Sequence, residues 1–491
     1  MKKYFILTMA VLLAACRQAQ VPESYDKGGT AAIYPDYQGV TVPINIAPLH
    51  FQLADEADEV VARFRAAGEE LVLEGPQVCP DFDEWDALKQ ADSITVELFA
   101  RRADKWVGYE PFQIYVSKDS IDPWVTYRLI SPSYVTYEEL TLNQRHLETF
   151  DERVIYDNML CSTEKDGQCI NCHHSQLGNP NRTLFHARQN LGGTMLQIDG
   201  KLHKVNLKTD STLSAGVYPA WHPVQNILAF STNNTMQSFH TRDIDKIEVL
   251  DSQSDLVLYD PETNEVSIIE NDSTEFETFP CWSPDGRWLY YASAHFEYKD
   301  TIEQSSESIL RYKEIRYNIY RKAFDAATRS FGPRQMVIDA DSMGLSATLP
   351  RVSPDGRFLL VAMGEWGTFH IWHRDADLWL MDLQTDSLRN LQEVNSEGVE
   401  SYHTWSRSGR WIVFSSRRTD GNYTRPFFAH VDADGRATKP FELPSDNPNY
   451  HRELMKSYNV PEFLRGPVPF SPQDFADALK KPAEPAKFKS R

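Results

Sequence analysis

The second half of the chain repeats a tight turn followed by a β-rich run, and this repeat restricts the fold more than any other feature. Its clearest copy is Pro280–Arg287, Pro-Cys-Trp-Ser-Pro-Asp-Gly-Arg, which leads into Trp288–Ala292. Proline at the second position and glycine where φ is positive make Ser-Pro-Asp-Gly a tight turn. The tryptophan before the turn is expected to fill the gap between adjacent sheets. A period of about 50 to 70 residues, with one antiparallel sheet in each, is typical of β-propeller blades.

Four copies of the repeat can be recognised. They are Tyr218–Pro223, Phe279–Arg287, Leu349–Arg357 and Tyr402–Arg410. The first has His222 in place of serine and the fourth has Arg407-Ser408 in place of Pro-Asp, so both turns are expected to be altered. Gly192–Lys201 is typical of a hairpin and would begin a further blade, closed by strands from the C-terminal side. We predict a propeller over residues 191–443, in which four blades can be counted and five or six fit.

A different β-rich region precedes the repeats. Five segments alternate or run apolar in the manner of strands: residues 43–53, 60–64, 93–101, 112–116 and 124–130. Residues 81–90 place Phe82, Trp85 and Leu88 three positions apart behind an acidic cap, which predicts a short helix. We expect residues 40–132 to form a small Ig-like β-sandwich, so that the whole chain is mainly β.

The segment between these regions, residues 133–190, is predicted to be helical and loop-rich. Tyr134–Phe150 has Leu140, Leu147 and Phe150 on one side and is expected to be helical, whereas residues 161–188 resemble loops. After the last blade, residues 444–491 are expected to form a C-terminal extension.

Residues 133–190 contain Cys169-Ile-Asn-Cys172-His173, and C-x-x-C-H is the attachment signature of a c-type haem. Two thiols at this spacing can reach the vinyl groups on one edge of a porphyrin, and the histidine can bind the iron. A redox dithiol, a disulfide or half of a zinc site would use the same cysteines, but no second Cys/His pair stands at zinc-finger spacing. We therefore predict covalent haem c at Cys169 and Cys172, with His173 as the proximal iron ligand.

The sixth ligand of such an iron decides between electron transfer and chemistry at the metal, because an open site favours chemistry. His186 is the first candidate, since it lies a short loop away, and Met195 is the second. His174 is adjacent to the proximal ligand and cannot reach the opposite face. A hydrogen-bonded structural histidine is the competing interpretation of His186.

The N-terminus predicts export and a lipid anchor. A short basic start precedes Tyr4–Leu13, an apolar stretch too short to span a bilayer. Leu-Ala-Ala-Cys16 then resembles a bacterial lipobox, although plain secretory cleavage is the alternative. Arg17 follows the cysteine, so nothing resembles an inner-membrane retention signal. We predict a signal peptide over residues 1–15, lipidation of Cys16, a tether over residues 16–39, and an outer-membrane lipoprotein on the periplasmic side or the cell surface.

Charge and cysteine content agree with an exported protein. The chain has 70 acidic and 50 basic residues, so its net charge of −20 argues against nonspecific nucleic-acid binding and favours a basic partner. Of the six cysteines, three remain after the lipid and haem assignments. A Cys79–Cys161 disulfide is allowed by this remainder, and Cys281 is expected to be a buried small hydrophobe.

The combination of lipobox, N-terminal β-domain, C-x-x-C-H and repeats resembles a family of TolB-like β-propeller lipoproteins of Bacteroidetes-type bacteria that carry a c-type haem motif. The resemblance spans most of the mature chain. It includes the segments Asn45–Leu49, Tyr127–Ile130, Phe185–Arg188 and Ala215–Pro219. It implies a propeller and a haem, and it supplies no reaction.

Two functions follow from these features. The first is electron transfer in the cell envelope, through a haem edge left exposed to a redox partner. The second is a docking module, in which the propeller holds an envelope protein and the haem is structural or absent. A hydrolase is disfavoured because the chain has no G-x-S-x-G. Asp243 with Asp245, or Asp375 with Asp377, could bind a cation, but such loop carboxylates more often cap turns.

Overall fold

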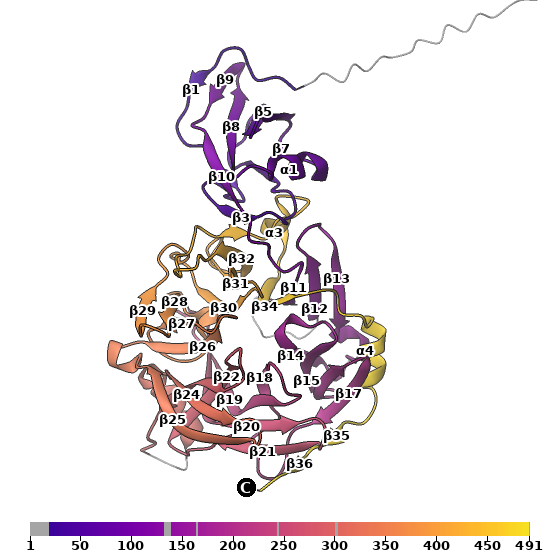
Figure 1. Cartoon of the computed structure of the whole chain (residues 1–491), viewed down its shortest axis with the longest axis vertical. Coiled ribbons are helices and arrows are strands. Elements are labelled where there is room, and N and C mark those ends of the chain that lie inside the picture. The colour runs from indigo at the N-terminus through magenta and orange to yellow at the C-terminus, as the bar shows by residue number, and fades with distance from the viewer. Residues whose placement is uncertain (1–18, 132–138, 164, 243–244, 300–302, 491) are drawn as a thin grey trace, which may run out of the picture.

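The computed structural model of the protein describes residues 19–131, 139–163, 165–242, 245–299 and 303–490. These residues form a mainly β protein, with a smaller N-terminal domain above a ring of sheets (Figure 1). The predicted signal peptide and lipidation site, Cys16, lie outside the described residues. Within those residues, no helix combines the length and the apolar character needed to cross a membrane.

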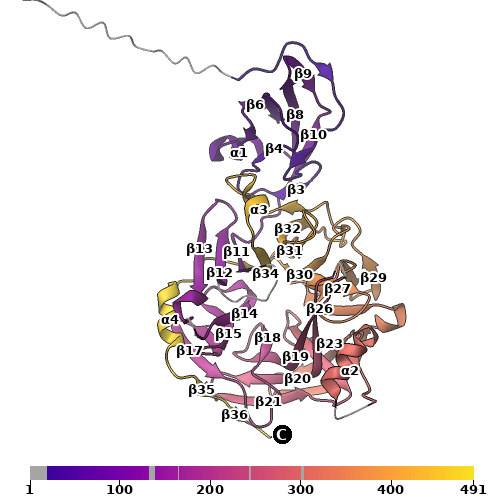
Figure 2. The same ribbon diagram turned by 180° about the vertical axis from the view of Figure 1, so that it is seen from behind.

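In the described residues, six four-stranded antiparallel arrangements follow one another around the ring, and we number them sheets 1 to 6 (Figures 1 and 2). Sheet 1 contains β34 (Ser457–Leu464), β11 (Trp124–Ile130), β12 (Thr141–His146) and β13 (Glu152–Asp157). Sheet 2 contains β14 (Gln168–Ser175), β15 (Arg182–Gln189), β16 (Gly193–Ile198) and β17 (Lys201–Asn206). Sheet 3 contains β18 (Val217–Trp221), β19 (Leu228–Phe239), β20 (Ile247–Asp260) and β21 (Glu265–Glu270).

The remaining three sheets complete the ring. Sheet 4 contains β22 (Glu275–Trp282), β23 (Trp288–His295), β24 (Asn318–Asp325) and β25 (Ser330–Ile338), and a single parallel bridge joins it to sheet 3. Sheet 5 contains β26 (Ser346–Val352), β27 (Phe358–Gly364), β28 (Asp377–Asp382) and β29 (Ser387–Asn390). Sheet 6 contains β30 (Glu400–Trp405), β31 (Trp411–Ser416), β32 (Arg425–His430) and β33 (Phe441–Glu442).

One strand of each sheet lies nearest the centre of the ring, and we call these strands the inner strands (Figure 1). In order around the ring they are β34, β14, β18, β22, β26 and β30, and each contacts the next, with β30 contacting β34. The chain thus closes the ring by pairing β34, from its C-terminal part, with β11. We expected residues 444–491 to lie outside the blades. That prediction is wrong for β34, because β11 needs a hydrogen-bonding partner on its inner edge and β34 supplies it.

Each inner strand carries one residue with positive φ at the same place. These residues are Cys172, Tyr218, Phe279, Leu349, Tyr402 and Val460, with φ between 47° and 54°. At this place the pairing register also shifts in all six sheets, which marks a β-bulge. A bulge bends a strand and redirects the side chains that follow it. The six strands therefore turn their following residues toward one end of the ring.

Tryptophans of the repeat link neighbouring sheets, as the sequence predicts. Trp282 of sheet 4 donates its indole N–H to the carbonyl of Ala220 in sheet 3, at 3.1 Å. Trp405 of sheet 6 donates to the carbonyl of Arg351 in sheet 5, also at 3.1 Å. Each indole thus fills the space between two sheets while its polar edge is satisfied.

The altered first turn has a compensating histidine. His222 Nδ1 accepts hydrogen bonds from the backbone N–H groups of Val224 and Gln225, at 3.1 and 2.9 Å. Its Nε2 lies 3.1 Å from the carbonyl oxygen of Gly286 in the neighbouring turn. A Cβ on Gly286 would come within 2.4 Å of the His222 ring, so this close approach requires glycine.

The N-terminal domain has one seven-stranded and one three-stranded sheet. The larger sheet contains β1 (Asp26–Lys27), β3 (Thr41–Pro43), β5 (Glu59–Ala66), β6 (Glu69–Glu74), β8 (Ser93–Arg102), β9 (Lys105–Gly108) and β10 (Phe112–Ser117). The smaller contains β2 (Ile33–Tyr34), β4 (Phe51–Leu53) and β7 (Gln77–Val78). The predicted short helix is α1 (Phe82–Leu88), capped by Asp81. β1 and β2 fall within the predicted tether, and β11 belongs to the ring.

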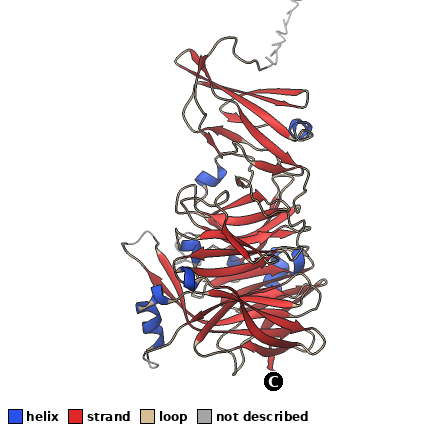
Figure 3. Cartoon of the chain, turned by 60° about the vertical axis from the view of Figure 1, so that its left-hand side comes forward, coloured by secondary structure: helices blue, strands red, loops and turns tan. Residues whose placement is uncertain are grey.

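The N-terminal domain is packed firmly on sheets 6 and 1. Its core is continuous with Trp411, Phe428 and Tyr458 of the ring. Among the described residues, three further α-helices lie outside the sheets: α2 (Gln304–Leu310), α3 (Tyr450–Glu453) and α4 (Pro472–Leu479), the last against β13 and β17 (Figure 3). The C-terminal strands β35 (Glu484–Pro485) and β36 (Lys487–Phe488) cover the outer edges of sheets 2 and 3.

The segment 133–190 differs most from expectation. Part of the predicted helix 134–150 lies outside the described residues, and the rest contains β12 rather than a helix. The loop-rich region of 161–188 contains β14 and β15. The sequence did not identify these segments as strands because they lack an apolar pattern. They carry histidine, asparagine, glutamine and arginine at positions buried against neighbouring sheets.

Candidate functional site: an axial pocket

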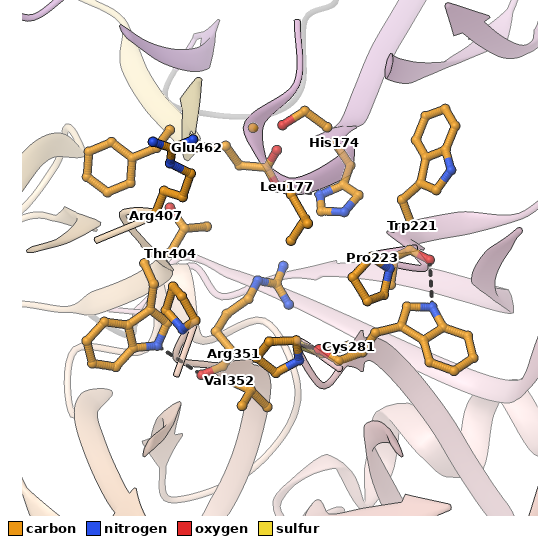
Figure 4. A pocket seen from close by; sticks show the side chains of 18 of the residues that line it. His174, Leu177, Trp221, Pro223, Cys281, Arg351, Val352, Thr404, Arg407 and Glu462 are labelled. Atoms are coloured by element: carbon orange, nitrogen blue, oxygen red, sulfur yellow. Dashed lines mark hydrogen bonds and ion pairs between the residues drawn. The ribbon is translucent and has the colours of Figure 1, made fainter. Parts of the chain in front are cut away.

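The bulged inner strands converge on a pocket of about 430 Å³ at one end of the ring, which we call the axial pocket (Figure 4). All six sheets contribute residues that follow their bulge. Representative lining residues, from sheet 1 to sheet 6, are Glu462, His174, Trp221, Cys281, Arg351 and Thr404. The pocket therefore exists only when the ring is closed, and its volume lies in the range of small-molecule sites.

The walls of the axial pocket are mainly apolar and rigid. Trp221, Trp282 and Trp405 occupy the same place in their repeats, and prolines stand beside them. Hydrogen bonds to neighbouring sheets hold the indoles of Trp282 and Trp405. Leu177 is 55% exposed and extends into the pocket (Figure 4). Exposed apolar groups held in a concave surface favour binding of an apolar molecule.

A histidine–glutamate pair lies on one side of the axial pocket. His174 Nδ1 lies 2.8 Å from Glu462 Oε1, which joins β14 to β34. Burial raises the pKa of Glu462, but the charge and hydrogen bond of His174 outweigh burial and hold this pKa below 4.5. Glu462 is therefore charged at neutral pH.

Arg351 brings a positive charge to the centre of the axial pocket. Its side chain extends from β26 between the walls (Figure 4). Cys281 faces the same space, and burial raises the pKa of its thiol. We expected Cys281 to be a buried small hydrophobe, but it is half-buried and lines the pocket.

Asp122, Arg407 and Arg465 also line the axial pocket, and we call this charged part of its lining the rim. Asp122 Oδ2 accepts a hydrogen bond from the backbone N–H of Arg407 at 2.6 Å. Burial raises the pKa of Asp122, although this hydrogen bond opposes the shift. Arg465 donates its Nε–H to the carbonyl of Leu177 at 2.9 Å. The rim is thus polar, whereas the walls are apolar.

A long hairpin crosses the ring at the end away from the axial pocket. β19 and β20 have 12 and 14 residues, and Val217 of β18 pairs with Ser231, so residues 232–239 run past the start of the inner strand. Glu248 of this hairpin lies 2.9 Å from His373 Nε2, and both side chains are buried. The hairpin of sheet 3 is thereby fixed to the loop that follows β27 in sheet 5.

The prediction of haem c at Cys169, Cys172 and His173 is wrong. Within the described parts of the chain, no group of three or more His, Cys, Asp or Glu side chains could hold a metal ion. His173 is 6% exposed, and the cavity beside it measures about 20 Å³, which holds roughly one water. A bound group the size of a porphyrin needs a pocket of several hundred Å³, on the order of 300–1,000 Å³.

The C-x-x-C-H segment is instead a structural element of sheet 2. Cys172-His173 occupies the bulge of β14, where sheets 3 and 4 have Tyr218-Pro219 and Phe279-Pro280. Cys169 is 8% exposed and packs in a core cluster with Ile170 and Phe185. Burial lowers the pKa of His173 to about 4, so this imidazole is neutral at pH 7.

The two candidates for the sixth iron ligand are also buried. His186 Nδ1 lies 3.1 Å from Thr194 Oγ1, and burial lowers the pKa of His186 to about 3. This is the hydrogen-bonded structural histidine that the sequence left as an alternative. Met195 is 0% exposed and lies in the same core cluster as Phe185.

The other cysteines and the acidic pairs have structural roles. Cys79 and Cys161 are both thiols rather than a disulfide. Asp375 Oδ2 accepts from the backbone N–H of Glu365 at 2.6 Å, and Asp245 Oδ1 accepts from that of Arg374 at 3.1 Å. These carboxylates stabilise loops, and Asp243 lies outside the described residues.

Sequence reasoning missed the residues that carry the charge of the axial pocket. His174 was set aside as the neighbour of a haem ligand, Glu462 fell in the predicted extension, and Arg351 was one position inside a repeat. The available signal was the repeat itself. Aligning the bulge residues of six strands, rather than the turns of four, places all three residues two positions after a bulge.

No family model and no curated protein matches this chain. A Synechocystis apocarotenoid oxygenase mutant is similar at a TM-score of 0.36 and 12% identity, covering 88% of this chain and 95% of that one. A puromycin-hydrolysing peptidase of Mycobacterium tuberculosis is similar at 0.34 and 14%, covering 86% and 57%. Prolyl oligopeptidase B from Galerina marginata is similar at 0.37 and 10%, covering 80% and 54%. All three TM-scores lie below 0.5, so none of these likenesses assigns a fold family or an activity.

Proposed function

We propose that this protein is an exported binding module, a six-bladed TolB-like propeller lipoprotein whose axial pocket takes a small ligand. The sequence left open a module that docks an envelope protein, and the present proposal differs from it because the bound partner is a small ligand. The observation that carries it is the contribution of all six sheets to one pocket with apolar walls and a central arginine. Because all six sheets line the pocket, a ligand can bind there only when the ring is closed. Docking of a basic envelope protein remains a prediction of the sequence.

Binding at the axial pocket can be tested with the dye 1-anilinonaphthalene-8-sulfonate, which has an apolar ring system and one anionic group. We expect the dye to bind the full chain with enhanced fluorescence, and we expect Leu177→Trp to weaken this binding by filling the pocket. Leu310→Trp is the matched control, because Leu310 lies on α2 and is 81% exposed. Equal dye binding by both variants would place the dye elsewhere and refute the pocket as the binding site.

The proposed lipid anchor has a separate test. Changing Cys16 to Ser removes the thiol that would be lipidated. We expect the variant to move from the membrane fraction to the soluble periplasmic fraction, whereas Cys79→Ser stays with the membranes. If the Cys16 variant and the parent fractionate alike, the protein is not anchored through this residue.

A further inference from the structure

The guanidinium of Arg351 in the axial pocket makes no salt bridge within the described residues, although the charge of Glu462 acts on it across the pocket. In the part of the chain that the structure describes, no carboxylate lies within 4.0 Å of the Arg351 side-chain nitrogens. In that part of the chain, the Arg351 side chain donates from Nη1 to the carbonyl of its neighbour Pro350, at 2.9 Å, and hydrogen-bonds the thiol of Cys281, which lines the same pocket. Arginine has five N–H donors and stays charged at all physiological pH values. Most of its donors therefore face the pocket.

Other arginines of the ring pair their guanidinium groups with carboxylates of the protein. Arg357, in the turn after β26, donates two hydrogen bonds to Asp382 Oδ2, at 3.0 and 2.8 Å. Arg182 pairs with Asp199 in sheet 2. Arg351 lies near the end of β26, close to a turn, as Arg357 and Arg182 do. Its side chain nevertheless extends between the apolar walls of the pocket instead of toward a surface carboxylate (Figure 4). A half-buried cation among apolar groups attracts an anion more strongly than a solvated one.

The charges around Arg351 limit the anion to a single negative charge. Glu462 lines the same pocket and is charged at neutral pH, and Asp122 stands at the rim. The guanidinium groups of Arg351, Arg407 and Arg465 line the pocket beside these two carboxyl groups, so the set leaves one positive charge. A monoanion balances that charge, whereas a dianionic phosphate adds a second negative charge in the same pocket as Glu462, and like charges repel. A carboxylate carries one charge and matches the planar fork of arginine through two parallel hydrogen bonds.

The walls of the axial pocket define the rest of the ligand. Trp282 and Trp405 are held by hydrogen bonds to the neighbouring sheets, so their indoles are fixed rather than adaptable. Fixed tryptophans and prolines favour a flat, rigid, apolar body, because such a body loses little conformational freedom when it binds. The volume of about 430 Å³ suits a molecule with one or two fused rings.

We propose that the ligand of the axial pocket is a carboxylate on a flat apolar body, with the carboxylate held by Arg351 and the body between the tryptophans and prolines of the walls. This proposal rests on the proposed function, since it specifies the ligand of the same pocket. Arg351 is then a specificity residue, and Cys281 and His174 are its neighbours in the pocket.

The experiment compares 2-naphthoate with 2-naphthamide, which has the same shape and no charge. Affinity for the full chain is measured by isothermal titration calorimetry and by displacement of the anilinonaphthalene dye. We expect naphthoate to bind at least about tenfold more tightly than naphthamide, because a charged hydrogen-bonded pair contributes roughly that factor. This preference needs no variant, so a failure of a variant to fold does not affect it.

Variants of Arg351 then test whether this residue causes the preference for naphthoate over naphthamide. Arg351→Met should reduce naphthoate affinity by about tenfold or more and leave naphthamide affinity unchanged, whereas Arg351→Lys should give an intermediate value, because lysine keeps the charge without the fork. Arg287→Met is the matched control, since Arg287 is 81% exposed. Equal affinity for both probes, unchanged by Arg351→Met, would overturn the carboxylate inference and leave pocket binding intact. If neither probe binds or displaces the dye, the inference and the proposed function both fail.

Discussion

Glu462 Oε1 lies 2.8 Å from His174 Nδ1, and this contact connects the last strand of the ring to the strand that contains the cysteine motif. Glu462 is on β34, which closes sheet 1, and His174 is on β14, the inner strand of sheet 2. The pair is therefore both a wall of the axial pocket and part of the closure of the ring. A single interaction thus contributes to the stability of the ring and to the shape of the pocket.

The first prediction concerns the charge of Glu462. Its pKa is held below 4.5 in the folded protein, since the effect of His174 outweighs burial. A carboxyl of this kind stabilises the fold above its unfolded pKa, and the stabilisation is lost as the pH falls through the folded pKa. We expect Glu462→Gln to lower the free energy of unfolding at pH 7 by roughly 1–3 kcal/mol, and to have a diminishing effect as the pH falls through the folded pKa of Glu462.

Urea denaturation at several pH values measures this difference. Glu453→Gln is the control, because Glu453 is an exposed glutamate on α3. A loss of the same size at pH 3 and pH 7 would mean that Glu462 acts through packing and not through its charge.

The second prediction concerns the cysteine motif. Cys172 occupies the bulge position that valine occupies in β34, at nearly the same φ. We therefore expect Cys172→Val to change the free energy of unfolding by less than about 1 kcal/mol. Ile170→Ala on the same strand removes a fully buried side chain and should cost roughly 2–5 kcal/mol. If Cys172→Val were as destabilising as Ile170→Ala, the equivalence of the six bulges would be wrong.

The turns of the ring could be predicted from the sequence better than its inner strands. Ser-Pro-Asp-Gly at 283–286 is a local signal, because proline and glycine determine backbone angles without help from distant residues. The same is true of α1, whose cap Asp81 lies next to the helix it begins. These elements were predicted with nearly correct bounds.

β14 and β34 could not be predicted in this way. β34 has its bulge at Val460, and pairing with β11 more than 300 residues earlier makes it a strand. β14 has polar residues that are buried only because sheets 1 and 3 cover them. Its cysteines and histidine also match a haem signature, and a short motif does not report whether a cavity large enough for the group exists beside it. His174 and Glu462 lie on these two strands, and for that reason they were missed, whereas Arg351 lies on β26, beside a turn that the repeat identifies.

The third prediction concerns Glu277, a residue of β22. It is fully buried, and burial, with a further contribution from Asp255, raises its pKa to about 9. The folded state therefore holds one more proton than the unfolded state between pH 4.5 and about pH 9, so stability falls as the pH rises across this window. Glu277→Gln should remove that fall and stabilise the protein at pH 8 by at least about 1 kcal/mol.

Thermal unfolding at pH 5 and pH 8 measures the effect. The gain should be larger at pH 8, and Glu297→Gln should show no such trend because Glu297 is exposed. A variant that is less stable than the parent at pH 8 would show that Glu277 is ionised in the folded protein and makes a favourable interaction there.

The last prediction concerns the hairpin that crosses the ring opposite the axial pocket. His373 and Glu248 are 0% and 1% exposed, and the indole N–H of Trp366 donates to Glu248 Oε2 at 3.1 Å. Burial lowers the pKa of His373, but the hydrogen bond and charge of Glu248 outweigh burial, so the net pKa lies above 6.5. A histidine of this kind stabilises the fold below its unfolded pKa, and the stabilisation is lost as the pH rises through the folded pKa. Glu248→Gln leaves the histidine buried without its counter-charge, a change that costs roughly 3–5 kcal/mol for buried pairs.

Because the pair joins only the hairpin and one loop, we expect this cost to appear as local opening and not as global unfolding. Hydrogen exchange of the amides of residues 247–251 at pH 6 should accelerate by about two orders of magnitude or more in Glu248→Gln. Exchange in β27 and β31 should be unchanged, and Glu262→Gln, at the exposed turn after β20, should behave as the parent does. In the parent, protection of the same amides should decrease as the pH is raised above the pKa of His373, after correction for the intrinsic pH dependence of exchange. If protection in the parent did not depend on pH and were unchanged in Glu248→Gln, packing of Ile247 and Leu250 alone would hold the hairpin across the ring.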